Sequence, residues 1–220
     1  MRTFKVIVFA LSLLTAHICT AQTDVAASVT GAFTFHSTSS SATLNTDPTA
    51  GGLLELRHFF SPRRGFAVAY SYRHVSQKFI SGPQPVPWVL QCSPGGINCT
   101  GPTPGYRFSI SATSNIHQFT ADWTPSQPAG NFRYFEVLGL GALVDLPADH
   151  PPDIILSRVS SPVLDFGAGV DWQHWQRFGV RAQYRGNLYQ APNLAAAFFG
   201  NDRALAMTNN LCLGVYFRPR

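Results

Sequence analysis

The chain has 220 residues, of which 45% are hydrophobic, 13% aromatic and only 12% charged, with 18 glycines and 16 prolines. Its length suits one domain with its own core, and the low charge beside so much apolar side chain excludes a disordered chain, a coiled coil and an ordinary helical enzyme. The formal net charge is +5 and falls to +3 when Arg2 and Lys5 are assigned to a removable leader, which is too mild for a nucleic-acid-binding surface.

Residues 1 to 21 have the pattern of a secretory signal peptide. Two basic residues precede an apolar run over 6 to 14, and small residues follow up to Ala21. The run is about half the length of a membrane-spanning helix. We expect cleavage after Ala21 and export of residues 22 to 220 as one domain. No later stretch is apolar enough for a spanning helix, so the exported chain either is soluble or crosses a membrane as strands.

Apolar and polar residues alternate with a period of two along most of the exported chain, which predicts strands with one apolar and one polar face. The pattern is clearest over 164 to 172 and 180 to 188, where all charged residues share one parity. We predict eight strands, over residues 25 to 36, 52 to 60, 66 to 74, 116 to 123, 132 to 144, 164 to 172, 180 to 188 and 210 to 217.

Two of these strands alternate less regularly. The apolar parity is even over 108 to 112 and odd after Asn115, so we expect a bulge near Ser114 or a strand that begins late. The strand over 132 to 144 is almost wholly apolar apart from Glu136, and we assign Glu136 to its polar face.

The connections between the predicted strands alternate in length. Three are short, at 61 to 65, 125 to 131 and 174 to 177, whereas four are long and polar, at 37 to 51, 75 to 107, 145 to 160 and 190 to 207. An antiparallel meander with an even number of strands places the short turns at one end and the long connections at the other. This arrangement matches the up-and-down barrels of outer membranes.

The two strand faces distinguish a soluble barrel from a membrane barrel. A soluble barrel exposes a charged face that is normally rich in lysine, yet the exported chain has one lysine, Lys78. Aromatic residues gather at strand ends beside the short turns, as in an interfacial girdle. They are Phe59, Phe60, Phe66, Trp123, Phe132, Tyr134, Trp172, Trp175, Phe178 and Phe217, with a smaller set, Phe33, Phe35, Tyr72, Phe108 and Tyr189, toward the long connections. We therefore predict an all-β fold, an eight-stranded antiparallel up-and-down transmembrane β-barrel with its apolar faces toward lipid.

The polar faces then line the barrel interior. An eight-stranded barrel is only wide enough for side chains to fill, and charges buried there must pair because unpaired ones are costly. We expect the charged residues to form a network that plugs the lumen, and the alternative is an ion pathway along the same residues. They are Glu55, Arg57, Arg73, Asp122, Glu136, Asp165, Asp171, Arg181 and Arg185.

Cys92 and Cys99 lie close together in a stretch rich in glycine and proline. Export favours a local disulfide between them, whereas a metal site would need a histidine or a third cysteine nearby. Proline and the cystine restrict the connection over 75 to 106, which lowers the cost of presenting Trp88 or Phe79 to a surface ligand. Protection from proteases is the alternative role. Cys212 lies in an apolar strand pattern, which is typical of a small buried residue.

The leader, the amphipathic strands, the alternating connections and the final Gly214-Val215-Tyr216-Phe217 together resemble the small outer-membrane β-barrels of the OmpA/OmpX type from Gram-negative bacteria. The most similar segments are 167 to 172 and 180 to 185, which form a hairpin in such barrels. The resemblance covers the whole exported chain. It implies a monomer in the bacterial outer membrane, contact with outer-membrane lipid, and assembly by the barrel-assembly machinery through the terminal aromatic Phe217.

Sites for chemistry are weak in this sequence. Catalysis on the same scaffold uses a histidine with a serine or an acid near the rim. Two histidines, His36 and His74, make only a loose grouping of that kind with Ser71, Ser76 and Glu55. The glycines over 139 to 141 lack the third glycine of a nucleotide-binding fingerprint. No cluster has metal-ligand spacing, so we expect no cofactor and no metal.

The leading hypothesis is a non-enzymatic outer-membrane barrel with a side-chain-filled lumen that supports envelope integrity and presents surface loops for interaction. Three alternatives stay open. They are a narrow ion-conducting pore, a soluble lipocalin-like binding barrel, and a barrel enzyme that modifies lipid A.

Overall fold

The computed structural model describes residues 22 to 38, 42 to 81, 109 to 149, 156 to 191 and 204 to 219. These residues form ten β-strands in one antiparallel sheet, and none of them lies in a helix long and apolar enough to cross a membrane. The strands are β1 (Gln22–Thr34), β2 (Ser37–Thr38), β3 (Ala42–Thr46), β4 (Thr49–Ser61), β5 (Arg64–Ser81), β6 (Ser109–Ala129), β7 (Phe132–Pro147), β8 (Val159–Trp172), β9 (Phe178–Gln190) and β10 (Leu205–Phe217).

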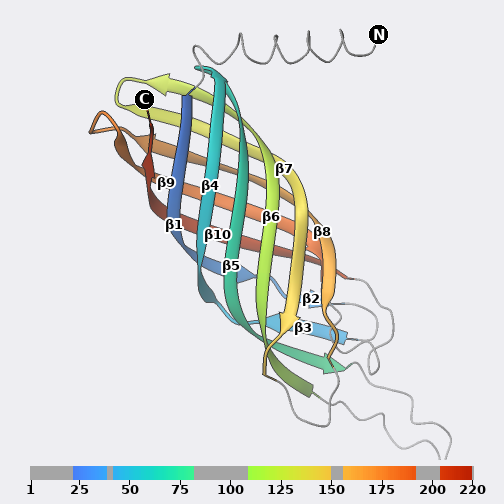
Figure 1. Ribbon diagram of the computed structural model, residues 1–220. Coiled ribbons are helices and arrows are strands. Elements are labelled where there is room, and N and C mark those ends of the chain that lie inside the picture. The colour runs from blue at the N-terminus through green and yellow to red at the C-terminus, as the bar shows by residue number, and fades with distance from the viewer. Residues whose placement is uncertain (1–21, 39–41, 82–108, 150–155, 192–203, 220) are drawn as a thin grey trace, which may run out of the picture.

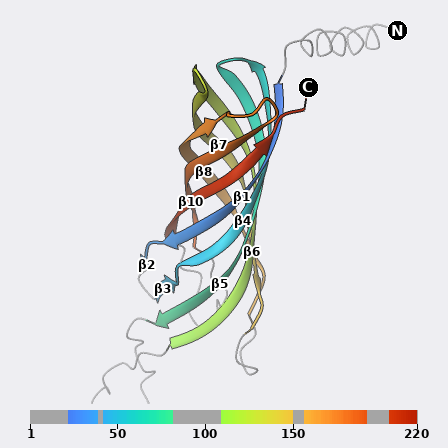
Figure 2. The same cartoon turned by 90° about the vertical axis from the view of Figure 1, so that its left-hand side faces the viewer.

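Eight of the strands close into a barrel. They follow the order β5-β4-β1-β10-β9-β8-β7-β6, and the pairing of β5 with β6 completes the ring. The start of β1 and the end of β10 lie beside the short hairpins, and the long connections lie at the opposite end (Figures 1 and 2). The predicted eight-stranded antiparallel barrel is therefore confirmed.

The other two strands lie in the connection between β1 and β4. β2 and β3 form a small hairpin, and β3 pairs with the far end of β5 from Gln77 to Ser81. The hairpin thus lengthens the barrel wall at its long-connection end, a feature that the alternation pattern did not predict.

β6 is longer than predicted and has no bulge near Ser114. Its register with β5 is continuous from Ser109 to Pro125. Ile110 and Ile116 both point into the barrel, so the change in apolar parity reflects an apolar interior at this level and not a break in the strand. The pairing of β5 with β4, in contrast, has a register shift between Phe59 and Ser61 of β4.

Burial alternates along the barrel strands with the apolar face outward. Val29, Leu140 and Leu213 are 70%, 68% and 64% exposed, whereas the guanidinium-bearing Arg57 and Arg181 are fully buried. This is the reverse of a soluble protein, in which large apolar side chains fill the core.

Gly139 allows β6 and β7 to approach closely around a buried acid. A Cβ atom at this position would collide with the Asp122 carboxylate and would lie 2.6 Å from the carbonyl oxygen of Ala121. The interior of β7 therefore uses glycine where its neighbour strand supplies a charge.

Candidate functional site: the charged lumen

Glu55 of β4 is the centre of an ion-pair network inside the barrel. Its Oε1 accepts hydrogen bonds from Arg57 Nη2 at 2.5 Å and from Arg181 Nη1 at 2.8 Å. Its Oε2 accepts from Arg185 Nη2 at 3.2 Å and from Gln183 Nε2 at 3.4 Å. One carboxylate thus joins three guanidinium groups that come from β4 and β9.

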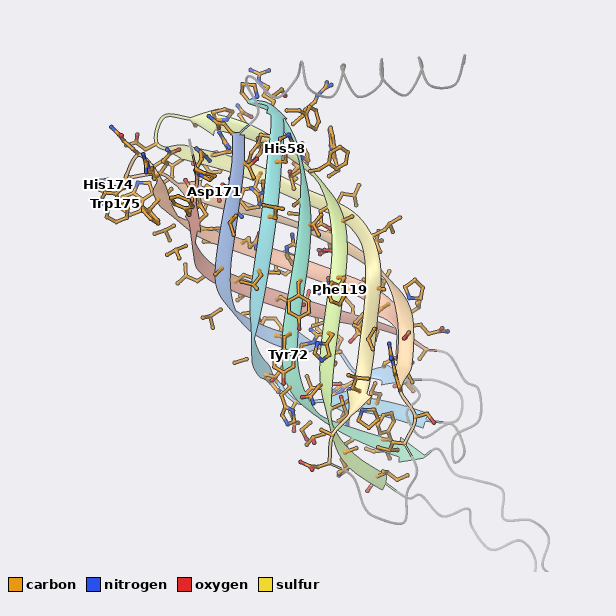
Figure 3. The ribbon with its side chains drawn as sticks, in the orientation of Figure 1. His58, Tyr72, Phe119, Asp171, His174 and Trp175 are labelled. Carbon is orange, nitrogen blue, oxygen red and sulfur yellow. The ribbon has the colours of Figure 1, made fainter. Side chains whose placement is uncertain are left out.

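Arg181 links this centre to the short-turn end of the lumen. Its Nε and Nη2 donate to the two oxygens of Asp171 at 2.7 and 3.1 Å, a bidentate geometry. Its Nη2 also donates to Asp24 at 3.1 Å, and Asp24 pairs with Arg218 at 3.5 Å. Figure 3 shows Asp171 in this half of the barrel. Asp24 and Arg218 thus belong to the network, although we did not predict them there.

Arg185 extends the network toward the middle of the barrel. Its Nη1 donates to Asp165 at 2.5 Å and its Nη2 to Asp122 at 2.8 Å. Thr120 donates to Asp122 at 3.1 Å. The ion-paired residues are five acids, Asp24, Glu55, Asp122, Asp165 and Asp171, and four arginines, Arg57, Arg181, Arg185 and Arg218.

Aromatic rings fill the space between the arginines. The Arg57 guanidinium lies 3.9 Å from the ring centre of Phe135, and that of Arg133 lies 4.4 Å from the ring centre of Phe59. Arg181 lies over Tyr216 at 5.3 Å. A cation is attracted to the face of an aromatic ring, so the inward-facing rings of Phe59 and Phe135 stabilise the arginines of the lumen. Phe59 therefore does not join the outer girdle to which we assigned it.

Arg73 lies in the lumen but outside the ion-pair network. Its Nη1 donates to Asn210 Oδ1 at 3.4 Å, and its Nη2 has no hydrogen-bond partner among the described residues. It lines a cavity of about 20 Å³ together with Thr30, Gln118 and Cys212, which is room for about one water molecule.

Apolar side chains close the lumen between this cavity and the long connections. The cluster consists of Val75, Ile116, Leu143, Val163, Tyr189 and Ala206. Polar contacts cross the same level. Gln77 Nε2 donates to Ser114 Oγ at 3.0 Å and to Asp145 Oδ2 at 2.9 Å, and the hydroxyl groups of Tyr189 and Thr208 are 2.9 Å apart. Tyr189, which we assigned to an outer aromatic belt, is part of this interior cluster. In the described part of the chain, side chains therefore fill the lumen from the charged network to the apolar cluster.

Glu136 does not belong to the network, which corrects our assignment. It is exposed on the outer face of β7, while its neighbours Phe135 and Val137 point inward. No hydrogen bond or ion pair joins it to another described residue. The reason is that the interior of β7 between Arg133 and Asp145 packs rings and glycines against charges from other strands, so the one charge in that stretch faces outward.

Six of the ten aromatic residues that we assigned to the girdle beside the short turns form contacts on the outer face at that end, namely Phe60, Phe66, Trp123, Trp172, Phe178 and Phe217. Phe66 and Trp123 pack edge to face with ring centres 5.0 Å apart, and Phe60 lies 5.6 Å from Trp123. Phe178 and Phe217 are 5.0 Å apart. Trp172 lies 5.2 Å from His174, near the tip of its hairpin (Figure 3).

The remaining candidate residues do not assemble into a reactive site. His74 is exposed on the outer face and contacts Asn115 Oδ1 through Nδ1 at 2.9 Å, whereas Ser71 lines the inner cavity and Glu55 is held by arginines. Cys212 is buried and free. The described residues contain no group of three or more potential metal ligands. Cys92, Cys99 and most of the connection over 75 to 106 lie outside the described residues. Phe79 is described, and it is buried with Leu44 and Ile110 inside the barrel, so our expectation that it faces a surface ligand is wrong.

Comparison with solved structures identifies proteins of similar shape. Ail of Yersinia pestis, solved with the heparin analogue sucrose octasulfate, has a TM-score of 0.51 at 12% identity, covering 90% of this chain and 99% of Ail. Neisserial surface protein A has a TM-score of 0.53 at 13% identity, covering 90% and 97%. The outer membrane protein OprG of Pseudomonas aeruginosa has a TM-score of 0.53 at 8% identity, covering 91% and 96%. No protein-family model and no curated protein sequence matches the chain.

Proposed function

We propose that this chain is a non-enzymatic protein of the bacterial outer membrane. It has the fold of the small eight-stranded outer-membrane β-barrels of the OmpA/OmpX type. Its filled lumen supports the envelope, and its long connections present surfaces for interaction. The observation that carries the proposal is the inverted polarity of the barrel. Fully buried arginines and acids fill the inside, and valine, leucine and phenylalanine side chains cover the outside. A lipid environment suits that arrangement, and water does not.

The filled lumen favours a structural role over conduction. An ion that moves along the axis must pass Glu55 and its three arginines and then the apolar cluster around Leu143. To open a path, one of these buried ion pairs would have to break, which costs about 3–5 kcal/mol. We expect no steady conductance in planar bilayers. Open-channel currents that change when Arg73 is replaced would favour the pore instead.

Two other functions have less support. A lipocalin-like binder needs an interior pocket of roughly 300–1,000 Å³, and the inner cavity beside Arg73 has about 20 Å³. A lipid A-modifying enzyme needs its histidine beside its serine or acid. His74 and Ser71 lie on opposite faces of β5. Ser76 shares the outer face with His74, but among the described residues the His74 ring contacts Asn115, and no hydrogen bond joins it to Ser76 or Glu55. An unchanged lipid A mass spectrum after overexpression is the expected result.

Assembly in the outer membrane is part of the proposal. Phe217 lies on the outer face at the end of β10, as a terminal recognition aromatic requires, while Arg218 turns inward to Gln173 at 2.6 Å and to Asp24. We expect removal of the leader near Ala21 and recognition of Phe217 by the barrel-assembly machinery.

The test is gel migration of membrane extracts in SDS with and without heating. A closed barrel satisfies its backbone hydrogen bonds internally, so we expect the unheated protein to stay folded and to migrate differently from the heated protein. A protein that is released without detergent and shows one migration position would overturn the proposal.

A further inference from the structure

The outer wall of the barrel contains a notch near the short turns that is lined by two charged residues. It has a volume of about 390 Å³ and is lined by Arg63, Gln127, Tyr134 and Glu136, among others. Arg63 and Glu136 carry opposite charges, and neither side chain has an ion-pair partner among the described residues. Charges on the lipid face of a barrel are costly, so an unpaired acid and base that share one notch indicate an external ligand.

The backbone holds the basic side of this notch in place. Ser126 of β6 donates its amide to the carbonyl oxygen of Arg63 at 2.9 Å and its hydroxyl to that of Pro62 at 3.1 Å. These bonds tie the turn between β4 and β5 to the neighbouring strand. Arg63 is therefore attached to a fixed turn beside the notch.

An apolar groove continues from the notch along β8, β9 and β10. It has a volume of about 840 Å³ and shares Tyr134, Ala168 and Gly169 with the notch. Small residues form its floor, and Val29, Leu211 and Leu213 lie along its far side. Tyr184 contributes its ring to the groove while its hydroxyl is satisfied by Asn209 Oδ1. The groove thus presents apolar surface beyond a charged entrance.

The position of Glu136 agrees with a lipid headgroup. Short turns face the periplasm in outer-membrane barrels. Glu136 lies four residues from Phe132, the first residue of β7, which is about 10 Å along the barrel axis for a tilted strand. That depth is near the boundary between headgroups and acyl chains of the periplasmic leaflet.

We propose that the notch and the groove together bind one phospholipid of the periplasmic leaflet that has an amine-bearing headgroup. The ammonium group lies beside Glu136, the phosphate beside Arg63, and one acyl chain lies in the groove over Ala168. The inference rests on the proposed membrane location. It goes beyond that location because it assigns a headgroup preference to two residues.

Native mass spectrometry of the detergent-extracted full-length protein tests this site. The protein is incubated with equal amounts of phosphatidylethanolamine and phosphatidylglycerol that have the same acyl chains, and the retained lipids are counted. We expect the wild type to retain phosphatidylethanolamine about two- to fivefold over phosphatidylglycerol, the upper part of the range of an exposed ion pair. Glu136→Gln is expected to bring that ratio close to one.

Matched variants separate the parts of the site. Arg63→Gln is expected to lower retention of both lipids, and Arg64→Gln, whose side chain does not line the notch, is expected to leave retention unchanged. Ala182 lines the groove and not the notch, so Ala182→Phe is expected to fill the groove alone and to lower retention of both lipids. Ala121 is an outer residue that lines neither depression, so Ala121→Phe is expected to leave retention unchanged.

The outcomes distinguish this inference from the proposed function. Equal retention of both lipids by the wild type, an unchanged ratio in Glu136→Gln, or a bound second copy of the chain in place of lipid would overturn the lipid site. Heat-dependent migration in SDS is measured on the same samples. Loss of that shift in the wild type would instead overturn the membrane barrel itself.

Discussion

Replacing Glu55 with glutamine removes the negative charge that three buried guanidinium groups share. The three ion pairs have lengths of 2.5, 2.8 and 3.2 Å, and the Glu55 side chain is 1% exposed. Arg57 loses most, because its other carboxylate, Asp171, is 3.6 Å away. Removing one partner of a buried pair costs about 3–5 kcal/mol, so we expect the free energy of unfolding to fall by at least about 3 kcal/mol.

The assay is urea unfolding of the protein in phospholipid vesicles, followed by tryptophan fluorescence and by gel migration. Glu136→Gln makes the same chemical change on the outer face, where the carboxylate has no ion pair among the described residues. Its effect is expected to stay within about 0.5 kcal/mol. Equal losses in the two variants, or a loss below about 1 kcal/mol for Glu55→Gln, would refute the assignment of these glutamates to opposite faces.

Gly139→Ala is expected to destabilise the barrel by about 1–3 kcal/mol in the same assay, because the added methyl group collides with the Asp122 carboxylate. Gly31→Ala has no atom within 4 Å of its new Cβ, and its loss should be smaller; the reverse order would contradict the register of β6 and β7. In a variant that lacks Cys92 and Cys99, Cys212 is expected to resist a water-soluble maleimide until the barrel is unfolded, because the thiol is buried. Rapid labelling of the folded protein would place this thiol in water.

The eight-stranded barrel follows from the sequence because each strand has two unlike faces. Charges at one parity identify the inward face of β4, β8 and β9, and the lengths of the connections identify the two ends. A shift by one residue would expose every one of these charges to the other face. The register of these strands is therefore strongly specified by local pattern alone.

β7 was misassigned at one residue because its interior contains almost no charge. Glu136 is the only charged residue between Arg133 and Asp145. Its neighbours Phe135 and Val137 face the lumen. A signal was present, because Phe132 and Tyr134 share the parity of Glu136 and had been placed in the outer girdle. Consistency along the strand would have put Glu136 outside as well.

Two further features depend on contacts that no local pattern contains. Asp24 has the parity of the inward residues of β1, but its partner Arg181 is far away in sequence. The inward Ile110 and Ile116 of β6 pack in apolar clusters with residues of other strands, such as Phe79 and Leu143. The change in apolar parity along β6 suggested a bulge, because the sequence of a single strand does not distinguish apolar residues that face the lumen from those that face outward.

Spin labels at two adjacent positions of β7 test the inverted polarity most directly. Val137 is 2% exposed and Leu138 is 57% exposed, so single cysteines at these positions sample the inside and the outside of one strand. In reconstituted vesicles, we predict that the label at 138 collides with oxygen, which concentrates in the bilayer, and not with a water-soluble nickel chelate, and that the label at 137 is shielded from both. Strong collisions between the label at 138 and the nickel chelate would contradict the account, because they would place the apolar face in water.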